Sequence, residues 1–295
     1  MIEMTQSLYY NIADFCINIR FNNTSENSIL LLPSFSPFRC SEERELLFTL
    51  LVDDTIKEEP DVSLIRDIDT GNGKTEVSIT KDNGYQFIIR NISGDKCCTL
   101  ITDSHFSQCK CALFGSNNMR SFGLNDALML IFAFAGSRKS TLLIHASCVG
   151  HNGHAYPFIA KSGTGKSTHS SLWLKHIPDT ELINDDNPIL RIDDNGIWLY
   201  GSPWSGKTPC YRNIKVALGA ITKIERSQTN SIQRLNPIMA FANMLPACSS
   251  MRWDNDIYNS MCDTITKIIE NIPIYTLFCK PDEEAAIICH KAIAK

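Results

Sequence analysis

The feature that most constrains this chain is a glycine-containing loop that stands between an apolar run and a predicted helix. The apolar run is Tyr156 to Ala160, and after it the chain reads Lys161-Ser162-Gly163-Thr164-Gly165-Lys166-Ser167-Thr168. A short apolar run of this kind predicts a buried strand, and Leu172, Trp173 and Ile177 predict the inner face of a helix. A strand, a loop and a helix in this order predict an α/β arrangement for this half of the chain.

The loop matches the phosphate-binding pattern G-x-x-x-x-G-K-[ST], except that Ala160 replaces the first glycine. Gly163 and Gly165 permit positive φ angles, so successive backbone N–H groups can turn towards an anion. The predicted helix adds the positive end of its dipole at the same place. The competing interpretation is a loop that only caps the helix, but such loops rarely place a lysine and two hydroxyl residues directly after the second glycine. The sequence therefore predicts that Lys161 to Thr168 bind a nucleotide.

Three side chains of this loop have predicted roles of their own. Lys166 is expected to reach the terminal phosphates as a point charge, and Ser167 is expected to ligate Mg²⁺. Thr168 is expected to support the α-phosphate side. The predicted ligands are therefore ATP and Mg²⁺, although the sequence does not distinguish ATP from another nucleotide.

Two adjacent acids, Asp185 and Asp186, follow the apolar pair Leu182-Ile183. A strand that ends in an acid beside a phosphate-binding loop commonly supplies a carboxylate to Mg²⁺. Neighbouring strand residues point to opposite sides, so one acid can ligate the metal while the other accepts the proton of an attacking hydroxyl. The sequence leaves open which acid does which. The alternative is a plain turn, because Asp-Asp-Asn-Pro is also turn-like, but the loop upstream favours the functional interpretation.

The first part of the chain predicts a separate, β-rich domain. Phe15 to Phe21 alternates between apolar and polar residues, which is the period of a half-buried strand. Val77 to Ile89 contains Asp82-Asn83-Gly84 at its centre, which predicts a hairpin. Nothing in this part suggests catalysis, so a structural or substrate-presenting role is expected. The boundary is placed near Asn118, which gives a β-rich domain over 1–118 and a nucleotide-binding domain over 119–295.

The second part combines helices and strands. Leu124 to Ala135 is predicted to form a buried helix, and Leu142 to Val149, which includes His145, is predicted to form one strand. Isoleucines and Met261 at helical spacing between Ile257 and Ile272 predict a long helix that Pro273 ends. The predicted fold class is therefore α/β, in the broad sense that includes α+β.

Composition excludes several classes of partner. The net charge is −4, so neither nucleic acid nor an anionic membrane is expected to attract the chain in general. The longest apolar stretch, Leu124 to Ala135, is too short to span a bilayer. The region Met1 to Tyr10 lacks the basic character of a signal peptide. We expect a cytoplasmic protein without nucleic-acid or membrane partners; the oligomeric state stays open, a homo-oligomer included.

The chain has twelve cysteines and no C-x-x-C spacing. Buried thiols in a reducing compartment are the simplest interpretation of their scattered positions. A metal site is the alternative, because Cys97, Cys98, Cys109 and Cys111 lie close in sequence.

The order of these motifs resembles the catalytic domain of HPr kinase/phosphorylase, a domain similar in fold to ATP-dependent phosphoenolpyruvate carboxykinase. The resemblance rests on His145, on Ser162 to Ser167 and on Leu182 to Asp186, within Leu142 to Tyr200. It implies a kinase-like domain with a mixed sheet and a P-loop (the phosphate-binding loop). It also implies that Lys166 and Ser167 hold phosphate and magnesium, and that Asp185 and Asp186 serve metal binding and hydroxyl activation, with His145 near them.

A later run, Gly201 to Lys207, resembles a group of HPr-kinase-like proteins of uncertain substrate. The glycine-rich, hydrophobic C-terminal signature by which HPr kinases engage their protein substrate is missing, which puts HPr as the acceptor in doubt. The chain is also shorter than the carboxykinases and shows no arginine-rich substrate pocket, so decarboxylation is not expected.

The leading hypothesis is an ATP- and Mg²⁺-dependent kinase that phosphorylates a hydroxyl, either a peptide serine or threonine or a small metabolite. The alternative is a nucleotide-binding regulatory or scaffold protein with little or no turnover, which Ala160 in place of glycine keeps open. A third hypothesis, ATP hydrolysis coupled to motion, lacks the additional sensor or finger elements that such motors use.

Overall fold

The computed structural model describes residues 6–22, 25–41, 45–69, 71–206 and 208–295. Its internal contacts divide the chain into two compact units, Met1–Ala135 and Gly136–Lys295. Both units are built on a mixed sheet, so the chain is an α/β protein in the broad sense expected. Within the described residues, no helix has both the length and the apolar character that a bilayer crossing needs.

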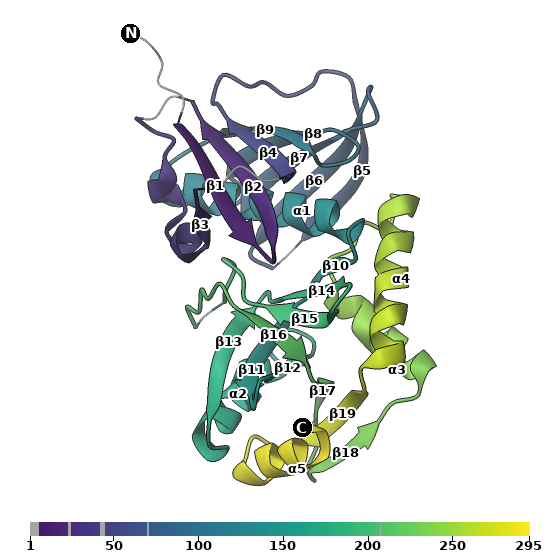
Figure 1. Ribbon diagram of the computed structural model, residues 1–295. Helices are drawn as coiled ribbons and strands as arrows, with labels where there is room; N and C mark the ends of the chain where they lie inside the picture. Colours follow the sequence, from purple (N-terminus) through teal and green to yellow (C-terminus); the bar gives the residue numbers. More distant parts are fainter. Residues whose placement is uncertain (1–5, 23–24, 42–44, 70, 207) are drawn as a thin grey trace. The chain divides into compact units, whose positions relative to one another are not determined.

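The first unit contains a nine-stranded sheet (Figure 1) in the order β3-β1-β2-β4-β9-β8-β7-β6-β5. The pairs β2/β4 and β4/β9 are parallel and the other neighbours are antiparallel. The predicted hairpin is confirmed as β6 and β7. The strands are β1 (Gln6–Ile12), β2 (Phe15–Phe21), β3 (Arg39–Cys40), β4 (Leu46–Val52), β5 (Val62–Asp69), β6 (Gly73–Thr80), β7 (Tyr85–Asn91), β8 (Lys96–Thr102) and β9 (Gln108–Leu113).

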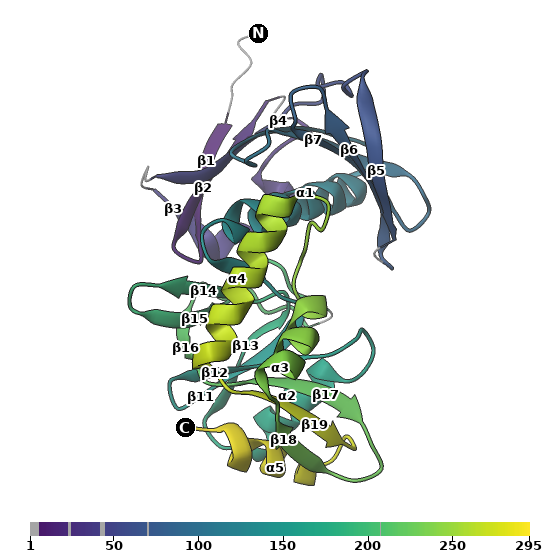
Figure 2. The same ribbon diagram turned by 90° about the vertical axis from the view of Figure 1, so that its right-hand side faces the viewer.

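One long helix, α1 (Asn117–Ser137), packs against this sheet, which curves over it in Figure 2. Its aromatic residues pack against those of the sheet and its turns. For example, the rings of Phe134 and Phe106 meet edge to face, with 5.3 Å between their centroids. The helix starts earlier than predicted because its first turns are polar. Arg120 in these turns is buried through an ion pair with Asp54 at 2.5 Å. The contacts assign most of α1 to the first unit, whereas the sequence placed the boundary near Asn118.

The second unit contains a ten-stranded sheet in the order β10-β14-β15-β16-β12-β17-β19-β18, with β11 between β12 and β13. The sequence did not predict β16 to β18. The strands are β10 (Thr141–Leu143), β11 (Ala146–His151), β12 (His154–Ile159), β13 (Thr180–Asp186), β14 (Ile189–Asp193), β15 (Gly196–Tyr200), β16 (Lys215–Leu218), β17 (Ile221–Arg226), β18 (Ser231–Arg234) and β19 (Ile274–Cys279).

Helices cover both faces of this second sheet. Alternate residues of β12 face opposite sides, as a strand requires: Ala155 joins one core cluster and Tyr156 the other. The cluster with Ala155 is closed by α3 (Pro237–Met244) and α4 (Asn255–Asn271), and the cluster with Tyr156 by α2 (Lys166–His176) and α5 (Glu283–Ile293). The predicted long helix is confirmed as α4, whereas α3 was not predicted.

Four strands of this sheet end at the same edge. β12, β17 and β19 are parallel to one another, and β13 runs in their direction because both it and β12 pair antiparallel with β11. The carboxyl ends of β12, β13, β17 and β19 therefore meet, which is where open α/β sheets place their ligand sites.

Candidate functional site

The loop Ala160–Gly165, here called the glycine loop, connects β12 to α2. Gly163 and Gly165 have φ angles of 74° and 130°, a backbone conformation that is strained for any residue with a side chain. There is space for a side chain, however, because a Cβ at either position would meet no atom within 4 Å. The glycines thus serve the backbone conformation and not close packing. Arg226, at the end of β17, donates from Nε to the Thr164 carbonyl at 3.1 Å and from Nη2 to the Gly163 carbonyl. Since the carbonyl and the following amide of a peptide plane point in opposite directions, this contact turns the loop amides away from Arg226.

The amino end of α2 presents free backbone donors. Gly165 is the N-cap, and no side chain caps the helix. Within the described residues, the amides of Gly165, Lys166, Ser167 and Thr168 donate no hydrogen bond to another residue. Unpaired first-turn amides together with the helix dipole favour an anion. This arrangement fits the phosphate groups predicted from the loop.

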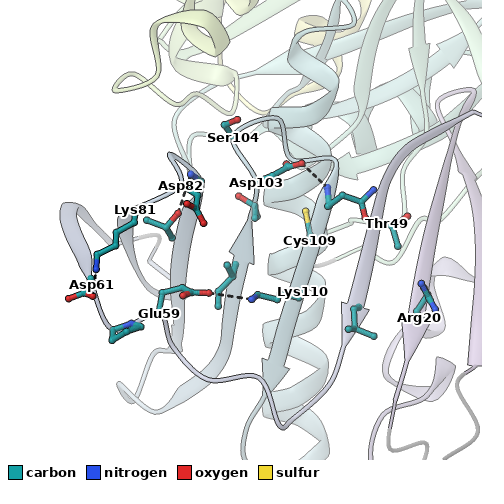
Figure 3. A pocket seen from close by; sticks show the side chains of 17 residues that line it. Arg20, Thr49, Glu59, Asp61, Lys81, Asp82, Asp103, Ser104, Cys109 and Lys110 are labelled. Carbon is teal, nitrogen blue, oxygen red and sulfur yellow. Dashed lines mark hydrogen bonds and ion pairs between the residues drawn. The ribbon is translucent and has the colours of Figure 1, made fainter.

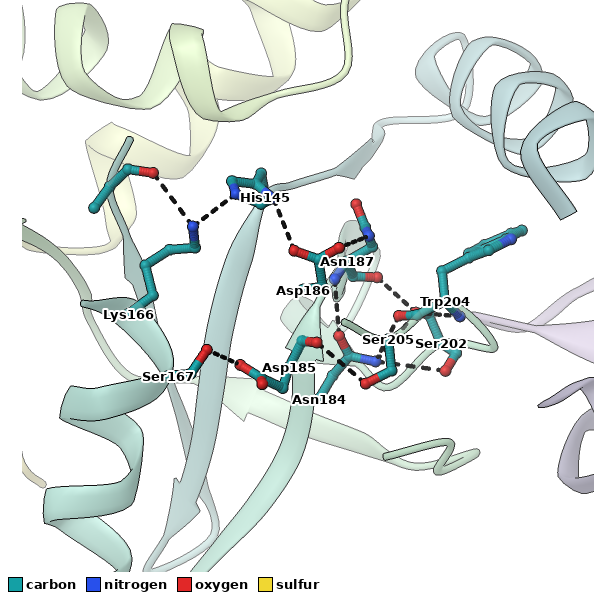
Figure 4. A network of polar contacts seen from close by, with 11 residues as sticks. His145, Lys166, Ser167, Asn184, Asp185, Asp186, Asn187, Ser202, Trp204 and Ser205 are labelled. Carbon is teal, nitrogen blue, oxygen red and sulfur yellow. Dashed lines mark hydrogen bonds and ion pairs between the residues drawn. The ribbon is translucent and has the colours of Figure 1, made fainter. Parts of the chain in front are cut away.

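His145 lies between Lys166 and Asp186 in a chain of polar contacts that starts at Lys166 (Figure 4). Nζ of Lys166 is 2.6 Å from Nε2 of His145, and Nδ1 of His145 is 3.0 Å from Oδ1 of Asp186. A protonated lysine has no acceptor, so Nε2 of His145 accepts and its Nδ1 donates to Asp186. Burial lowers the pKa of Lys166, an effect that Asp186 and Asp185 oppose.

The prediction of a single strand from Leu142 to Val149 is wrong, and the difference matters for His145. The chain breaks between β10 and β11, so His145 lies between two strands and not within one. The break forms because the His145 amide donates to the Ala247 carbonyl at 2.7 Å, while Ile144 pairs with Cys248. These backbone bonds hold the imidazole beside the end of β13.

The register between β11 and β13 places the acids beside the loop. Asp186 pairs with Ala146, next to His145, and Asp185 pairs with Ser147. Asp185 is only 3% exposed, and its Oδ1 accepts a hydrogen bond from the Ser167 hydroxyl at 2.7 Å. The two acids therefore contact different partners, as the alternation of a strand predicts.

Asp186 combines a strained backbone with a stabilised charge. Its φ of 144° is unusual for a residue with a side chain, and such strain is often kept at functional sites. Burial raises the pKa of Asp186, but hydrogen bonding and charge from His145, the charge of Lys166 and a hydrogen bond from Asn187 together outweigh it, so the net pKa is lowered. The carboxylate is therefore held ionised.

Hydrogen bonds connect the segment Gly201–Gly206 to the end of β13. The Gly206 amide donates to the Asp185 carbonyl at 2.5 Å, and the Ser205 hydroxyl donates to the same carbonyl at 3.1 Å. The buried Asn184 amide donates to the Trp204 carbonyl at 3.1 Å (Figure 4). Sequence reasoning did not single out Asn184 or Ser205, although both lie within or beside motifs that it recognised. Lys207, the last residue of the run that resembles the HPr-kinase-like proteins, lies outside the described residues.

The oxygen atoms around Ser167 suit Mg²⁺, which substrate phosphates help to coordinate, better than a metal ion that protein side chains coordinate alone. The described residues contain no cluster of three or more His, Cys, Asp or Glu that could hold a metal ion. Mg²⁺, however, commonly uses one or two carboxylates together with substrate phosphates. Asp185, Asp186 and the Ser167 hydroxyl offer such oxygens beside the free amides. The cysteines are all free thiols, and Cys97, Cys98, Cys109 and Cys111 are buried.

The first unit carries a hollow of its own, of about 720 Å³ (Figure 3). Basic and acidic side chains line it together, and several pair with each other: Lys110 with Glu59 at 3.3 Å, and Lys81 with Asp61. The lining has three basic and four acidic side chains, so it has no strong excess of one charge that would define a ligand. The substrate-presenting role of this unit stays a prediction.

The structure brings the predicted residues into one region at the carboxyl edge of the second sheet. Lys166, His145 and Asp186 form one chain of contacts, and Ser167 contacts Asp185. Lys161 and Ser162 are exposed at the outer side of the loop, and Thr168 is exposed on the first turn of α2. Arg226 is a further residue that sequence reasoning missed, because it lies far along the chain on a strand that was not predicted. No protein-family model matches the chain, and no curated protein matches it.

Proposed function

We propose that the chain is an ATP- and Mg²⁺-dependent kinase that transfers the γ-phosphoryl group to a hydroxyl acceptor, either a peptide serine or threonine or a small metabolite. One observation carries the proposal: free amides at the start of α2 lie beside two carboxylates with separate partners, Asp185 with Ser167 and Asp186 with His145. The proposal includes that the second unit is related in fold to HPr kinase/phosphorylase and to phosphoenolpyruvate carboxykinase. The glycine loop is then its P-loop.

Asp185 and Ser167 are assigned to the metal side of the site. Their oxygens lie 2.7 Å apart at the beginning of α2, next to the amides that would hold the phosphates. Asp185 and Ser167 would hold Mg²⁺ there, and the ion would neutralise negative charge on the phosphate groups. Lys166 adds a positive charge at the same end of the nucleotide, which favours the transition state of phosphoryl transfer.

Asp186 is assigned as the proton acceptor. Its side chain is 35% exposed, so an acceptor hydroxyl can approach it, whereas Asp185 is buried against Ser167. The hydroxyl oxygen forms the new bond to phosphorus as the bond to the β,γ-bridging oxygen breaks, ADP leaves, and the hydroxyl proton passes to Asp186. His145 orients this carboxylate through the 3.0 Å contact from Nδ1.

The direct test is transfer of labelled γ-phosphate from ATP into a metabolite mixture and a peptide library, combined with calorimetric measurement of MgATP binding. Lys166→Ala is expected to abolish transfer and to weaken MgATP binding strongly, because it removes the positive charge beside the phosphates. Asp186→Asn is expected to lower transfer by about 10²–10⁴-fold, the usual contribution of a general base, while MgATP binding is retained.

Asp179→Asn is the matched control, because Asp179 is an exposed turn residue of the same unit with a φ of 54° that asparagine tolerates. It should leave both measurements unchanged. MgATP binding without transfer to any acceptor would support the regulatory or scaffold alternative. Rapid phosphate release independent of any acceptor would support a hydrolase instead. Unchanged transfer in Asp186→Asn would refute the proton-acceptor role.

A further inference from the structure

A cleft of about 530 Å³ opens beside the glycine loop, between α2 and the carboxyl ends of β17 and β19. It begins at the loop itself, since Gly163, Thr164 and Gly165 form part of its wall. Its volume lies within the range of about 300–1,000 Å³ that is typical of small-molecule sites. The roles assigned so far to Lys166, Ser167 and the two acids leave this cleft without a function.

The topology of the sheet decides which part of a nucleotide this cleft can receive. The acids lie on β13, which is joined through β11 to one side of β12, whereas β17 and β19 follow on the other side. The terminal phosphate must lie near Lys166 and the acids for transfer to occur. The remainder of the nucleotide then extends towards β17 and β19. Neither Asp185, Asp186 nor His145 lines the cleft.

The walls of the cleft suit a flat ring with polar edges. Leu172 of α2, Ile224 of β17 and Pro281 after β19 supply apolar surface. Ser227 and Lys280 supply polar groups at the strand ends. Apolar walls with a few placed polar groups are the usual lining of a small-molecule site.

His169 adds an unpaired donor to this lining. It is 2% exposed, and its Nε2 accepts a hydrogen bond from Nε1 of Trp173 at 3.1 Å, so the neutral ring carries its proton on Nδ1. Nδ1 has no hydrogen-bond partner within the described residues. A buried donor without a partner is costly, and the residue that carries it is one of those that line the cleft.

A second hollow, of about 560 Å³, also borders the glycine loop. Apart from the residues that it shares with the cleft, its lining is Lys161, Ser162, Lys223 and Glu225, and the last two form an ion pair. This lining is polar throughout and offers no apolar wall of its own for a base. The cleft that contains Leu172 is therefore the better receptor for a nucleoside.

We infer that the cleft between α2 and the ends of β17 and β19 binds the nucleoside of the nucleotide, with the base between Leu172, Ile224 and Pro281. This inference rests on the proposed function, because it takes the phosphates to lie on the glycine loop. It assigns Leu172 as a residue that determines nucleoside affinity. Arg226, whose side chain holds the loop carbonyls at the mouth of the cleft, is a positioning residue.

The test compares two ligands that share phosphates but differ in the nucleoside: MgATP and magnesium tripolyphosphate, each titrated calorimetrically into the full chain. The unaltered protein should bind MgATP more tightly. Leu172→Trp fills the cleft and should raise the Kd of MgATP about ten-fold or more while leaving the Kd of tripolyphosphate unchanged. Leu174→Trp is the matched control, because Leu174 is 41% exposed on the same helix and does not line the cleft. This variant should change neither the Kd of MgATP nor the Kd of tripolyphosphate.

The outcomes separate this inference from the kinase proposal. Equal affinity of the unaltered protein for the two ligands, or unchanged MgATP binding in folded Leu172→Trp, overturns the nucleoside assignment and leaves phosphate binding standing. Absence of binding for both ligands in the unaltered protein overturns both proposals. Should Leu172→Trp fail to fold, Gln228→Trp at the exposed rim gives the same comparison, with selective loss of MgATP expected and equal effects on both ligands contradicting the assignment.

Discussion

A buried basic side chain in each unit lies against a polar or charged partner. Arg120 is 6% exposed and contacts Asp54 in the first unit, and Lys166 is 8% exposed and contacts His145 in the second. Removing one member of such a pair leaves the other without compensation, which is costly in a low-dielectric interior. Asp126 of α1 is different: its carboxyl group is half-buried, no attractive partner among the described residues offsets the burial, and burial therefore raises its pKa to about 7.

Asp126 should therefore make the first unit less stable as the pH rises. Below about pH 4 the carboxyl is protonated in both the folded and the unfolded state, and between about pH 4 and 7 the unfolded state ionises first. The free energy of unfolding should fall over this window by at most about 4 kcal/mol. Asp126→Asn should remove that loss, so the variant should be more stable than the parent at pH 8 and equally stable near pH 4. Hydrogen exchange of β7 and β8 at the two pH values measures this; a pH-independent difference would contradict it.

At the level of elements, close approach of backbones decides how α1 sits on its sheet. Gly123 lies in the interior of α1, where a Cβ would come within 2.8 Å of the Cys97 carbonyl group and of the Cys98 side chain on β8. Backbone atoms cannot move aside without displacing the strand. The glycine is therefore needed for packing, although glycine disfavours a helix.

Gly123→Ala should destabilise the first unit by about 1–3 kcal/mol, the usual cost of overpacking, despite the better helix propensity of alanine. Gly136→Ala near the end of the same helix is the control, because its Cβ would be 3.4 Å from Thr141. That variant should be neutral or more stable by up to about 1 kcal/mol. Urea unfolding followed by far-ultraviolet circular dichroism compares the two. Equal stability of both variants would show that α1 can shift away from β8.

On the scale of the whole molecule, each unit has its own sheet and its own hydrophobic core. All four tryptophans, at positions 173, 198, 204 and 253, lie in the second unit. Trp173 is fully buried on α2, the helix that follows the glycine loop. Tryptophan fluorescence therefore reports on the unit that carries the candidate site.

If this unit binds MgATP, the ligand should raise its thermal midpoint as followed by tryptophan fluorescence. A ligand at 100 times its Kd stabilises the folded state by about 2.7 kcal/mol. Lys166→Ala should show little or no shift at the same concentration. An equal shift in the parent and in Lys166→Ala would mean that the stabilising ligand does not occupy the glycine loop.

The local backbone geometry of the glycine loop and of the end of β13 could be predicted because it depends on residues that are adjacent in the chain. A positive φ at Gly163 and Gly165, free amides at the start of a helix, and two acids at a strand end follow from short segments whose backbone preferences are strong. The hairpin β6–β7 and the helix α4 could be predicted for the same reason, since turn residues and helical spacing are local signals.

Contacts between distant segments were decided only by the tertiary structure. Arg226 reaches the Thr164 carbonyl across 62 residues of sequence, and His145 meets Asp186 because backbone bonds to η3 (Leu245–Ala247) break the strand and the register of β11 with β13 aligns them. The cleft beside α2 likewise exists because β17 and β19 follow β12 in the sheet. Strand order depends on the burial of whole faces, a sum over many residues that no single segment of the chain encodes.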